Sequence, residues 1–571
     1  MKVVDKRILS EYLKSYIPQF TIDEIEDLIE IPPASINYNY AFPVFRLAKF
    51  EKKDPKLIAQ ELVERFQIPS FIQKIEAKGP YLNFQVKNKL VLENIFELKE
   101  TYGKIQEIRK DKKFNPVKVV IEYPSPNTNK PLHLGHVRNM LLGNSVYNLF
   151  KYLGHTIYQV NLNNDRGIHI CKSMLAYQKW GQNEEPNKKS DHFVGDYYIK
   201  YSQKEEEDPS ILKQVKEMLK KWEEGDPEIR ALWEKMNKWA LKGFHETYEK
   251  FGISFDKEYY ESEFYYKGKD LILEGLKKGI FEKGDEGEIL AKLENKYDLP
   301  NKVLLRSDGT SIYITQDIYL ANLKKEDFNP DLSIFVVGNE QDLYFKQLFA
   351  VLEMLNFKEN KYHLSYGMIS LPEGKMKSRE GTVVDADDIL EKMQNLAYKE
   401  VDKRYPDLSE QEKDNRAKII GMAGLRFFIL KYSPRTDFVF NPKESISFEG
   451  ETGPYIQYCY ARIESIINKS QENISLDIDF ERFTHEKELD LIKNLNYFPE
   501  IIQSAIQTYG IHLIPQYLLT LGQSFNSFYS SCPVISENKE LERARLLLIK
   551  CVQIVINIGL KILGIEILES M

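Results

Sequence analysis

The feature that most constrains the fold is a strand–turn–helix–strand pattern between residues 117 and 162. VKVVIEY is a β-rich apolar run, and the turn residues PSPNTNKP follow it. Apolar residues then recur near helical spacing up to Gly154, after which HTIYQVNL predicts a second strand. Two strands joined through a helix run parallel, so the pattern predicts a βαβ unit. Its ligand crevice is expected at the carboxyl ends of the strands.

The rest of the chain predicts further domains around this unit. All four tryptophans lie between residues 175 and 295 among charge-rich helical segments, and strand signals return afterwards in LSIFVVG. KVLLRSDGTSIYITQD (302–317) predicts a hairpin. The predicted fold is therefore multidomain α/β plus α: an N-terminal α/β module at 1–110, a Rossmann-like parallel-sheet domain at 115–395 split by an insertion at about 175–295, and a helix bundle at 396–571.

Charge and cysteine usage exclude several classes of protein. A net charge of −7 gives no support for a nucleic-acid partner, although it leaves room for a local basic surface. The four cysteines are scattered, which argues for a reducing compartment and against a zinc ribbon or a disulfide framework. The charged N-terminus excludes a signal peptide, and no apolar run reaches the roughly 20 residues that span a bilayer. We expect a cytoplasmic protein without membrane association.

The segment HLGH (133–136) is the strongest candidate for chemistry. It lies at the turn between the first strand and its helix, where backbone N–H groups and the helix dipole favour an anion. His133 and His136 project from one face of the first helical turn, and Gly135 leaves room for a flat base. Two imidazole donors there suit a phosphate that gains charge during displacement. The alternatives are part of a metal site or two solvated cap histidines.

HLGH, preceded by PNTNKP, resembles the HIGH signature of class I aminoacyl-tRNA synthetases. That family also needs a KMSKS loop after the last strands of its split sheet, and GKMKSREG (374–381) is similar to it. The flanking segments resemble arginyl-tRNA synthetases over nearly the whole chain. The segments that carry this resemblance are EYPSPNTNKP (122–131), SDGTSIYITQD (307–317), GNEQDLYFKQL (338–348), GETGPYIQYCYARI (450–463) and the closing LGIEILESM.

The resemblance implies a pocket for L-arginine. A guanidinium presents five donors and is always charged, so carboxylates and amide oxygens hold it best. Glu122 is expected to engage the α-amino group, and Asp317 and Tyr313 to face the guanidinium. Without the resemblance, Tyr313 would be interpreted as a core aromatic and Asp317 as a helix N-cap. The remaining expected pocket residues are Ser125, Asn127, His133 and Gln341.

The resemblance also implies an ATP site. His133, Gly135 and His136 are expected at the α-phosphate end, and Lys375, Met376 and Lys377 at the β- and γ-phosphates. The chain has Ser378 where the loop signature has its second lysine. Lys130, just before HLGH, is expected to substitute for it. The alternative for the lysine loop is a solvated basic turn.

The tRNA for arginine is the macromolecular partner that the resemblance implies. Tyr81 and Asn83 in the N-terminal module are expected to contact the tRNA elbow, with ordinary sheet packing as the alternative. Single-stranded loops are recognised by stacking on aromatics and by base-edge hydrogen bonds. The residues expected to read the anticodon are Tyr455, Tyr458, Asn526 and the terminal Met571.

The expected activity is that of an arginine–tRNA ligase with ATP as co-substrate and Mg²⁺ travelling with ATP, with no protein-bound metal and a monomeric state. Three other interpretations stay open. A nucleotidylyltransferase also uses HxGH, but it explains neither the helical C-terminal third nor the pocket residues. An inactive paralogue would bind only RNA or partner proteins. A class I enzyme for cysteine or glutamine would keep the fold and change the amino acid.

Overall fold

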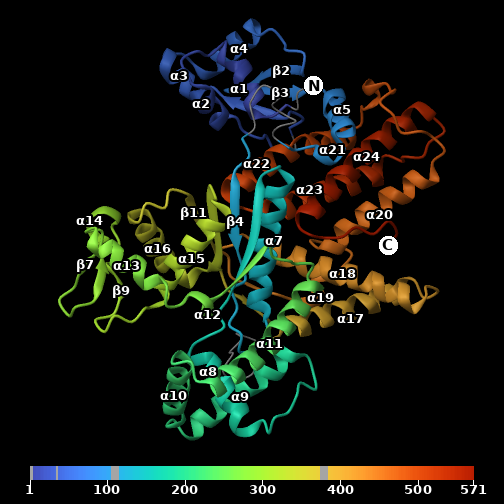
Figure 1. Cartoon of the computed structure of the whole chain (residues 1–571). Coiled ribbons are helices and arrows are strands. Elements are labelled where there is room, and N and C mark those ends of the chain that lie inside the picture. The colour runs from blue at the N-terminus through green and yellow to red at the C-terminus, as the bar shows by residue number, and fades with distance from the viewer. Residues whose placement is uncertain (1–3, 34–35, 105–114, 373–383) are drawn as a thin grey trace. The chain divides into compact units, whose positions relative to one another are not determined.

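The computed structural model describes residues 4–33, 36–104, 115–372 and 384–571 (Figure 1). The chain forms two compact units, each with its own core. Unit 1 comprises Met1–Asn115, Arg426–Lys431 and Glu444–Met571, and unit 2 comprises Pro116–Leu425 and Tyr432–Lys443.

Unit 2 is built on a five-stranded parallel sheet in the order β11-β10-β4-β5-β6. The predicted βαβ unit is confirmed as β4 (Lys118–Glu122), α7 (Leu134–Tyr152) and β5 (Thr156–Asn163). Both faces of β4 are covered, which explains its unbroken apolar run. The other strands of this sheet are β6 (Lys257–Tyr260), β10 (Leu332–Gly338) and β11 (Asn360–Tyr366).

The sheet has its topological switch point between β4 and β10. After β4 the chain builds the sheet in one direction through β5 and β6, then crosses back to place β10 and β11 on the other side of β4. Phe335 of β10 is the register partner of Glu122, the last residue of β4. In an open α/β sheet the crevice for ligands lies at such a point, outside the carboxyl ends of the strands. The N-terminus of α7 starts there.

Two groups of elements are inserted between the strands of the sheet along the sequence. One precedes β6 and the other follows it. The first is a helical module between β5 and β6, drawn in teal and green in Figure 1, whose core contains Trp222 and Met236. The predicted insertion at 175–295 is therefore not continuous: β6 lies inside it and pairs with β5. Its four residues, KEYY, are too short and polar to give a buried-strand signal. The helices of the first group are α8 (Ile168–Trp180), α9 (Ser190–Glu207), α10 (Ile211–Glu223) and α11 (Pro227–Lys250).

The second group follows β6 and contains the antiparallel sheet β7-β8-β9. The predicted hairpin at 302–317 is only half right. β9 turns back at 306–310, where the Arg306 N–H donates to the Thr310 carbonyl at 3.1 Å, but helix α15 begins at Tyr313. Ile314 and Ile318 bury their side chains at helical spacing, which overrides the local strand pattern. The elements are α12 (Glu261–Phe264), α13 (Gly268–Lys277), β7 (Glu282–Lys283), β8 (Ile289–Ala291), α14 (Glu294–Tyr297), β9 (Lys302–Leu305) and α15 (Tyr313–Phe328).

Helices and one short strand pair complete the second half of the sheet domain. β12 (Ile369–Ser370), which comes soon after β11, pairs in parallel with β13 (Phe438–Val439). The pair joins the end of the sheet to the segment that follows helix α18 in the sequence. The remaining elements are α16 (Asp342–Met354), α17 (Ala386–Arg404), α18 (Glu410–Leu430) and α19 (Pro442–Ser445).

Unit 1 joins an N-terminal α/β module to C-terminal helices. The module has an antiparallel sheet in the order β1-β3-β2, and its α5 packs on α21 and α24. The Tyr102 hydroxyl donates to the Leu495 carbonyl at 3.1 Å, and the Tyr497 hydroxyl donates to the Asn39 carbonyl at 2.8 Å. The predicted fold class is confirmed. The elements are α1 (Lys6–Lys14), α2 (Ile22–Leu28), β1 (Tyr40–Pro43), α3 (Phe45–Glu51), α4 (Pro55–Arg65), β2 (Ile72–Lys78), β3 (Tyr81–Val86), α5 (Asn88–Leu98), α20 (Gly453–Lys469), α21 (Glu486–Asn496), α22 (Phe498–Thr508), α23 (Leu513–Ser531) and α24 (Lys539–Ile562).

Across the described ranges, none of the helices has the length and apolar character needed to cross a membrane.

Candidate active site

The loop after β4 is held in a strained conformation by side chains of β5 and the residue after it. Ser125 has φ +55°, in the left-handed region that residues with a Cβ rarely adopt. Its N–H donates to Asn161 Oδ1 at 3.2 Å, and its carbonyl accepts from Asn164 Nδ2 at 3.0 Å. The fully buried Asn161 donates in turn to Glu258 Oε2 of β6 at 3.2 Å. The predicted pocket residue Ser125 is thus fixed by a chain of polar contacts across the sheet.

Helix α7 begins with a capping box made of two histidines. His133 is the N-cap: its Nδ1 accepts from the Gly135 N–H at 3.1 Å, and His136 Nδ1 accepts from the His133 N–H at 3.1 Å. A ring nitrogen that accepts a hydrogen bond carries no proton, so the proton of each neutral ring lies on Nε2. The ring centroids are 3.9 Å apart. Each histidine therefore offers one oriented Nε2–H donor.

Both histidines are neutral at pH 7. Burial, together with the charge of Lys130, lowers the pKa of His133 to about 4. Burial, His133 and Lys130 hold the pKa of His136 well below its ordinary value, and burial also lowers the pKa of Lys130. The desolvated ammonium of Lys130 gains from an anion placed beside it, and the two neutral rings add N–H donors. The arrangement is compatible with a phosphate group, whose binding here stays a prediction.

Gly135 is required by the capping box itself. A Cβ at this position would lie 2.9 Å from Cε1 and 3.0 Å from Nδ1 of the His133 ring. Any side chain would displace the ring from its cap. The glycine that was expected to make room for a nucleotide base therefore also makes room for His133.

Two carboxylates that were predicted to bind arginine, Glu122 and Asp317, lie close to each other near the end of β4. Glu122, at the end of β4, is buried and forms an ion pair with Lys324 of α15. Asp317 of α15 accepts a hydrogen bond from the Tyr344 hydroxyl of α16. Burial raises the pKa of Asp317 to about 6, although Tyr344 opposes the shift. Sequence reasoning missed Lys324 and Tyr344, although Tyr344 lies within a quoted family segment.

Three predicted pocket residues lie at the surface. Tyr313, the first residue of α15, is 76% exposed, so the alternative that it is a core aromatic is wrong. Gln341 precedes α16 and is exposed, as is Asn127 in the loop after β4. Their roles in the pocket stay predictions.

The predicted phosphate-binding residues Lys375, Met376 and Lys377 lie outside the described residues, but both flanks of their segment are described. After it, Leu134 N–H donates to the Val384 carbonyl at 3.0 Å, and Ala386 N–H donates to the Leu132 carbonyl at 2.8 Å. One N–H of the first turn of α7 is therefore already satisfied by the chain itself, and the His133 cap satisfies a second. The predicted anion site would therefore depend more on the histidines than on free helix N–H groups.

The flank before this segment is held by Arg138, which follows HLGH by two residues. Arg138 is 1% exposed and donates to the carbonyls of Gly367 and Met368 at 2.5 and 3.1 Å. It also donates to the carbonyls of Pro434 and Thr436, both at 2.8 Å. Burial lowers the pKa of Arg138 to about 10, so it remains charged at pH 7. The signal was a charged residue within an apolar helix, and sequence reasoning passed over it.

One group of side chains in the described part of the chain has the spacing of a metal site. Ligand atoms of Asp191, His192 and Asp387 lie within 4.8 Å of one another. The Lys189 ammonium, however, lies 2.9 Å from Asp191 Oδ2 and 2.8 Å from Asp387 Oδ2. A lysine thus already bridges the two carboxylates, so we assign no metal to this cluster.

In the N-terminal module, Tyr81 and Asn83 lie on the central strand β3. Tyr81 is partly exposed and packs edge-on against Phe45, with ring centroids 5.8 Å apart. Asn83 is 3% exposed, and its amide lies 3.5 Å from the Glu76 carbonyl. Of the two, Tyr81 is the more accessible to a base.

The structure brings three of the predicted anticodon residues together. Asn526 of α23 donates to the Tyr455 hydroxyl of α20 at 2.7 Å, and its Oδ1 accepts from Arg462 at 3.3 Å. Arg462 also donates to the Tyr458 hydroxyl and lies 4.5 Å from the centre of that ring. Sequence reasoning missed Arg462, which organises the cluster. Met571 is partly exposed at the chain end.

Comparison with known proteins agrees with this geometry. Residues 98–442 match the family model "tRNA synthetases class I (R), catalytic domain", residues 456–571 match "DALR anticodon binding domain", and residues 5–86 match "Arginyl tRNA synthetase N terminal domain". The arginine–tRNA ligase of Treponema denticola is 42% identical, with 100% of both chains covered. That of Parabacteroides distasonis is 43% identical over 92% of this chain and 93% of its own.

A solved structure supports the same assignment. The arginyl-tRNA synthetase of Thermus thermophilus superposes with a TM-score of 0.84 at 25% identity, with 100% of both chains covered. The family match spans more than half of the chain, and relatives above 40% identity cover nearly all of it. This chain belongs to the arginyl-tRNA synthetase family.

Proposed function

We propose that the site at the carboxyl end of β4 carries out the first half-reaction of arginine–tRNA ligation with the residues predicted above. A carboxylate oxygen of L-arginine attacks the α-phosphorus of ATP, which forms a mixed anhydride, arginyl-adenylate, and breaks the bond to pyrophosphate. A ribose hydroxyl of the 3′-terminal adenosine of the tRNA then attacks the arginyl carbonyl, and AMP leaves. No protein nucleophile is needed, so the site works by positioning and electrostatics.

The observation that carries the proposal is the placement of two carboxylates, Glu122 and Asp317, close to each other at the carboxyl end of β4. A largely buried carboxylate with a pKa of about 6 lacks sufficient cationic partners in the described structure. A guanidinium, always charged, supplies two donors in a plane and is the ligand that such a carboxylate favours. Glu122 engages the α-amino group in this proposal, with Lys324 as the cation that it holds otherwise. The other proposed contacts of arginine are Ser125, Asn127, His133, Tyr313 and Gln341.

ATP is the second substrate, and Mg²⁺ accompanies it as part of that substrate. The Nε2–H groups of His133 and His136 face the α-phosphate in this proposal, and Gly135 leaves the approach open. Lys130 adds a desolvated ammonium, which strengthens its attraction to phosphate. Lys375, Met376 and Lys377 are the proposed contacts of the β- and γ-phosphates.

The tRNA spans further surfaces in this proposal. Tyr81 and Asn83 contact the elbow, and Tyr455, Tyr458, Asn526 and Met571 contact the anticodon loop. The corresponding functional domains are 1–110, 115–395 and 396–571. Arginine activation is expected to depend on the presence of tRNA. We further propose that the protein acts as a monomer in the cytoplasm.

The specificity of the reaction is tested by charging total tRNA with each amino acid in turn. Only arginine is expected to be esterified, because its planar, charged guanidinium matches the Asp317 carboxylate. Charging by another amino acid and not by arginine would overturn the proposal.

The phosphate role of Lys130 is tested by Lys130→Ala. We expect the rate of tRNA-dependent ATP–pyrophosphate exchange to fall about 100-fold, as when one preorganised donor is removed from a transition state. The tRNA dissociation constant, measured by filter binding, is expected to stay within about twofold. Equal losses in rate and in tRNA affinity would argue against a phosphate contact.

A further inference from the structure

Residues 384–386, which we call the strap, pair with the turn that leads into α7. Leu134 N–H donates to the Val384 carbonyl at 3.0 Å, and Ala386 N–H donates to the Leu132 carbonyl at 2.8 Å. His133 faces Asp385 in an isolated antiparallel bridge between these two bonds. Any shift of the strap would therefore move the main chain that carries His133.

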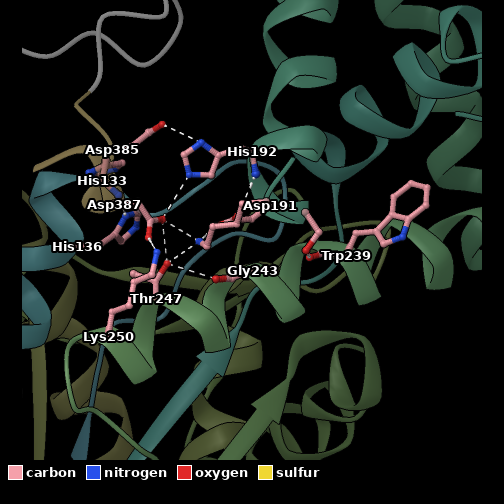
Figure 2. A network of polar contacts seen from close by, with 12 residues as sticks. His133, His136, Asp191, His192, Trp239, Gly243, Thr247, Lys250, Asp385 and Asp387 are labelled. Carbon is pink, nitrogen blue, oxygen red and sulfur yellow. Dashed lines mark hydrogen bonds and ion pairs between the residues drawn. The ribbon is translucent and has the colours of Figure 1, made fainter. Parts of the chain in front are cut away.

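The residue after the strap, Asp387, is surrounded by cationic groups from two insertion helices (Figure 2). Its Oδ1 lies 2.7 Å from Lys250 Nζ of α11. Its Oδ2 lies 2.8 Å from Lys189 Nζ and 3.4 Å from His192 Nε2, at the start of α9. Burial alone would raise the pKa of Asp387, but the bonds from His192, Lys189 and Lys250 outweigh it and hold this pKa well below its ordinary value.

The insertion is built so that these cations converge. Asp191 of α9 is fully buried and accepts from Lys189 Nζ at 2.9 Å. A Cβ at Gly243 of α11 would overlap the Asp191 carboxyl group, so only glycine lets the two helices approach here. Thr247, one turn further along α11, accepts from Lys189 Nζ at 2.6 Å and lies 3.2 Å from Asp387 Oδ2. Figure 2 shows His192 of α9 and Thr247 and Lys250 of α11 pointing toward Asp387.

Interaction with the dipole of α17 does not by itself explain why Asp387 has several specific partners. An acidic residue in the first turn of a helix is stabilised by the helix dipole and needs no specific partner. Asp388, the next residue in the same turn of α17, is exposed and fits that description. Asp387 instead pairs with two lysine ammonium groups and the His192 ring, and its own side chain is only 15% exposed.

We propose that Asp387 is a positioning residue for arginine activation. The cations of α9 and α11 fix Asp387, Asp387 fixes the strap, and the strap fixes the main chain of His133. The Nε2–H of His133 is thereby held where charge develops on the α-phosphate. The helical insertion thus gains a role in the first half-reaction. This inference rests on the proposed function of His133.

The first test is Asp387→Asn in the full-length protein with tRNA present. The variant keeps the shape of the side chain and loses its charge. We expect kcat of ATP–pyrophosphate exchange to fall about 10- to 100-fold, because small displacements of a transition-state donor are costly. KM for arginine and ATP should change much less than kcat, because His133 is the contact displaced and its hydrogen bond to the α-phosphate counts mainly in the transition state. Asp387→Glu should recover part of the rate, and Asp388→Asn is the matched control that should leave it unchanged.

The second test is a double-mutant cycle with His133→Ala. If Asp387 acts through His133, the double variant should be no slower than His133→Ala alone. Rate losses that multiply would overturn the inference while leaving the proposed function standing. An unchanged kcat in His133→Ala would overturn the proposed function, and this inference with it.

A milder variant covers the case in which Asp387→Asn fails to fold. Lys250 is half-exposed, so Lys250→Met should leave the fold intact and remove one of the two ammonium groups that pair with Asp387. We expect kcat to fall about threefold with unchanged KM, the smaller effect of a partly solvated charge. A folded Lys250→Met variant with unaltered kcat would count against the positioning role of Asp387.

Discussion

Unit 2 contains two clusters in which aspartates lie near lysines, and the aspartate pKa is shifted in opposite directions in the two clusters. In the pocket formed by Glu122, Asp317, Lys324 and Tyr344, burial raises the pKa of Asp317 to about 6. In the clamp formed by Asp387, Lys189, His192 and Lys250, the pKa of Asp387 is held well below its ordinary value. The difference lies in the number of cationic donors that reach each carboxylate. This difference is what we expect if the Asp317 carboxylate pairs with a bound cationic ligand, whereas the Asp387 carboxylate is already paired within the fold.

The sharpest way to break this comparison is Asp317→Asn. We expect KM for arginine to rise at least about 100-fold, since losing one partner of a desolvated charge pair costs about 2–5 kcal/mol. Thermal stability at pH 7 should stay equal or increase, because an ionised carboxylate with a raised pKa opposes folding. Pyrophosphate exchange with varied arginine and differential scanning calorimetry measure the two effects. An unaltered KM would remove Asp317 from the pocket, and Tyr344→Phe should show a smaller change in KM.

Arg138 tests whether a buried cation that is held mainly by main-chain carbonyls also stabilises the fold. Arg138→Met removes the guanidinium donors from four main-chain carbonyls, of which those of Met368 and Pro434 keep a main-chain donor, so the free energy of unfolding should fall by about 3 kcal/mol. Denaturant unfolding followed by circular dichroism measures it. Lys151→Met is the matched control, because it removes a charge of the same sign from the exposed end of the same helix. Equal stabilities of the two variants would show that Arg138 is dispensable to the fold.

Asp387→Asn tests the clamp by stability. The folded pKa of Asp387 lies below the unfolded one, so its contribution is present above about pH 4 and is lost as pH falls through the folded value. We expect the variant to lose about 1–2 kcal/mol at pH 7 and to approach the parent below about pH 4. Thermal unfolding between about pH 3 and 8 gives the curve. If the variant is more stable than the parent at pH 7, the ionised Asp387 carboxylate opposes folding, as we expect for Asp317.

Glu500 of unit 1 gives the smallest expected effect and sharpens the comparison. Burial raises its pKa to about 7, yet it accepts from the Tyr40 hydroxyl at 2.7 Å and from the Lys6 N–H at 3.1 Å. A raised acid pKa means that stability present below pH 4.5 is lost as pH rises through about 7. Relative to the parent, Glu500→Gln should gain about 1 kcal/mol between about pH 5 and 8 with unchanged arginine KM. If the stability difference between Glu500→Gln and the parent does not change with pH, Glu500 does not titrate in this range.

Much of the fold and the centre of the site were predictable because local patterns agreed with the final environment. The apolar run of β4 and the periodicity of α7 are buried as their sequences predict, and HLGH occupies the N-terminus of α7. β6 was missed because four polar residues at the edge of a sheet give no periodic signal. Tyr313 was placed in a hairpin because its alternating neighbours look like a strand, and only tertiary packing of Ile314 and Ile318 selects the helix.

The partners of the site residues could not be predicted in the same way. Lys324 meets Glu122 across two elements that are far apart in the sequence, and Lys189 meets Asp387 across nearly two hundred positions. No local pattern encodes such pairs, since each depends on how helices pack over the sheet. The predicted site residues lie within recognisable sequence motifs, whereas the partners that position them, such as Lys324 and Lys189, do not.

Arg138 contacts its neighbours through their main-chain oxygens, and this has a consequence for how the family can vary. A carbonyl is supplied by every amino acid, so Ser433 and the exposed Thr436 are free to change identity without weakening the contact. Gly367 is not, because a Cβ there would overlap Asp437 Oδ1. In a saturation library scored for growth, we therefore expect tolerant positions at 433 and 436 beside intolerant ones at 138 and 367.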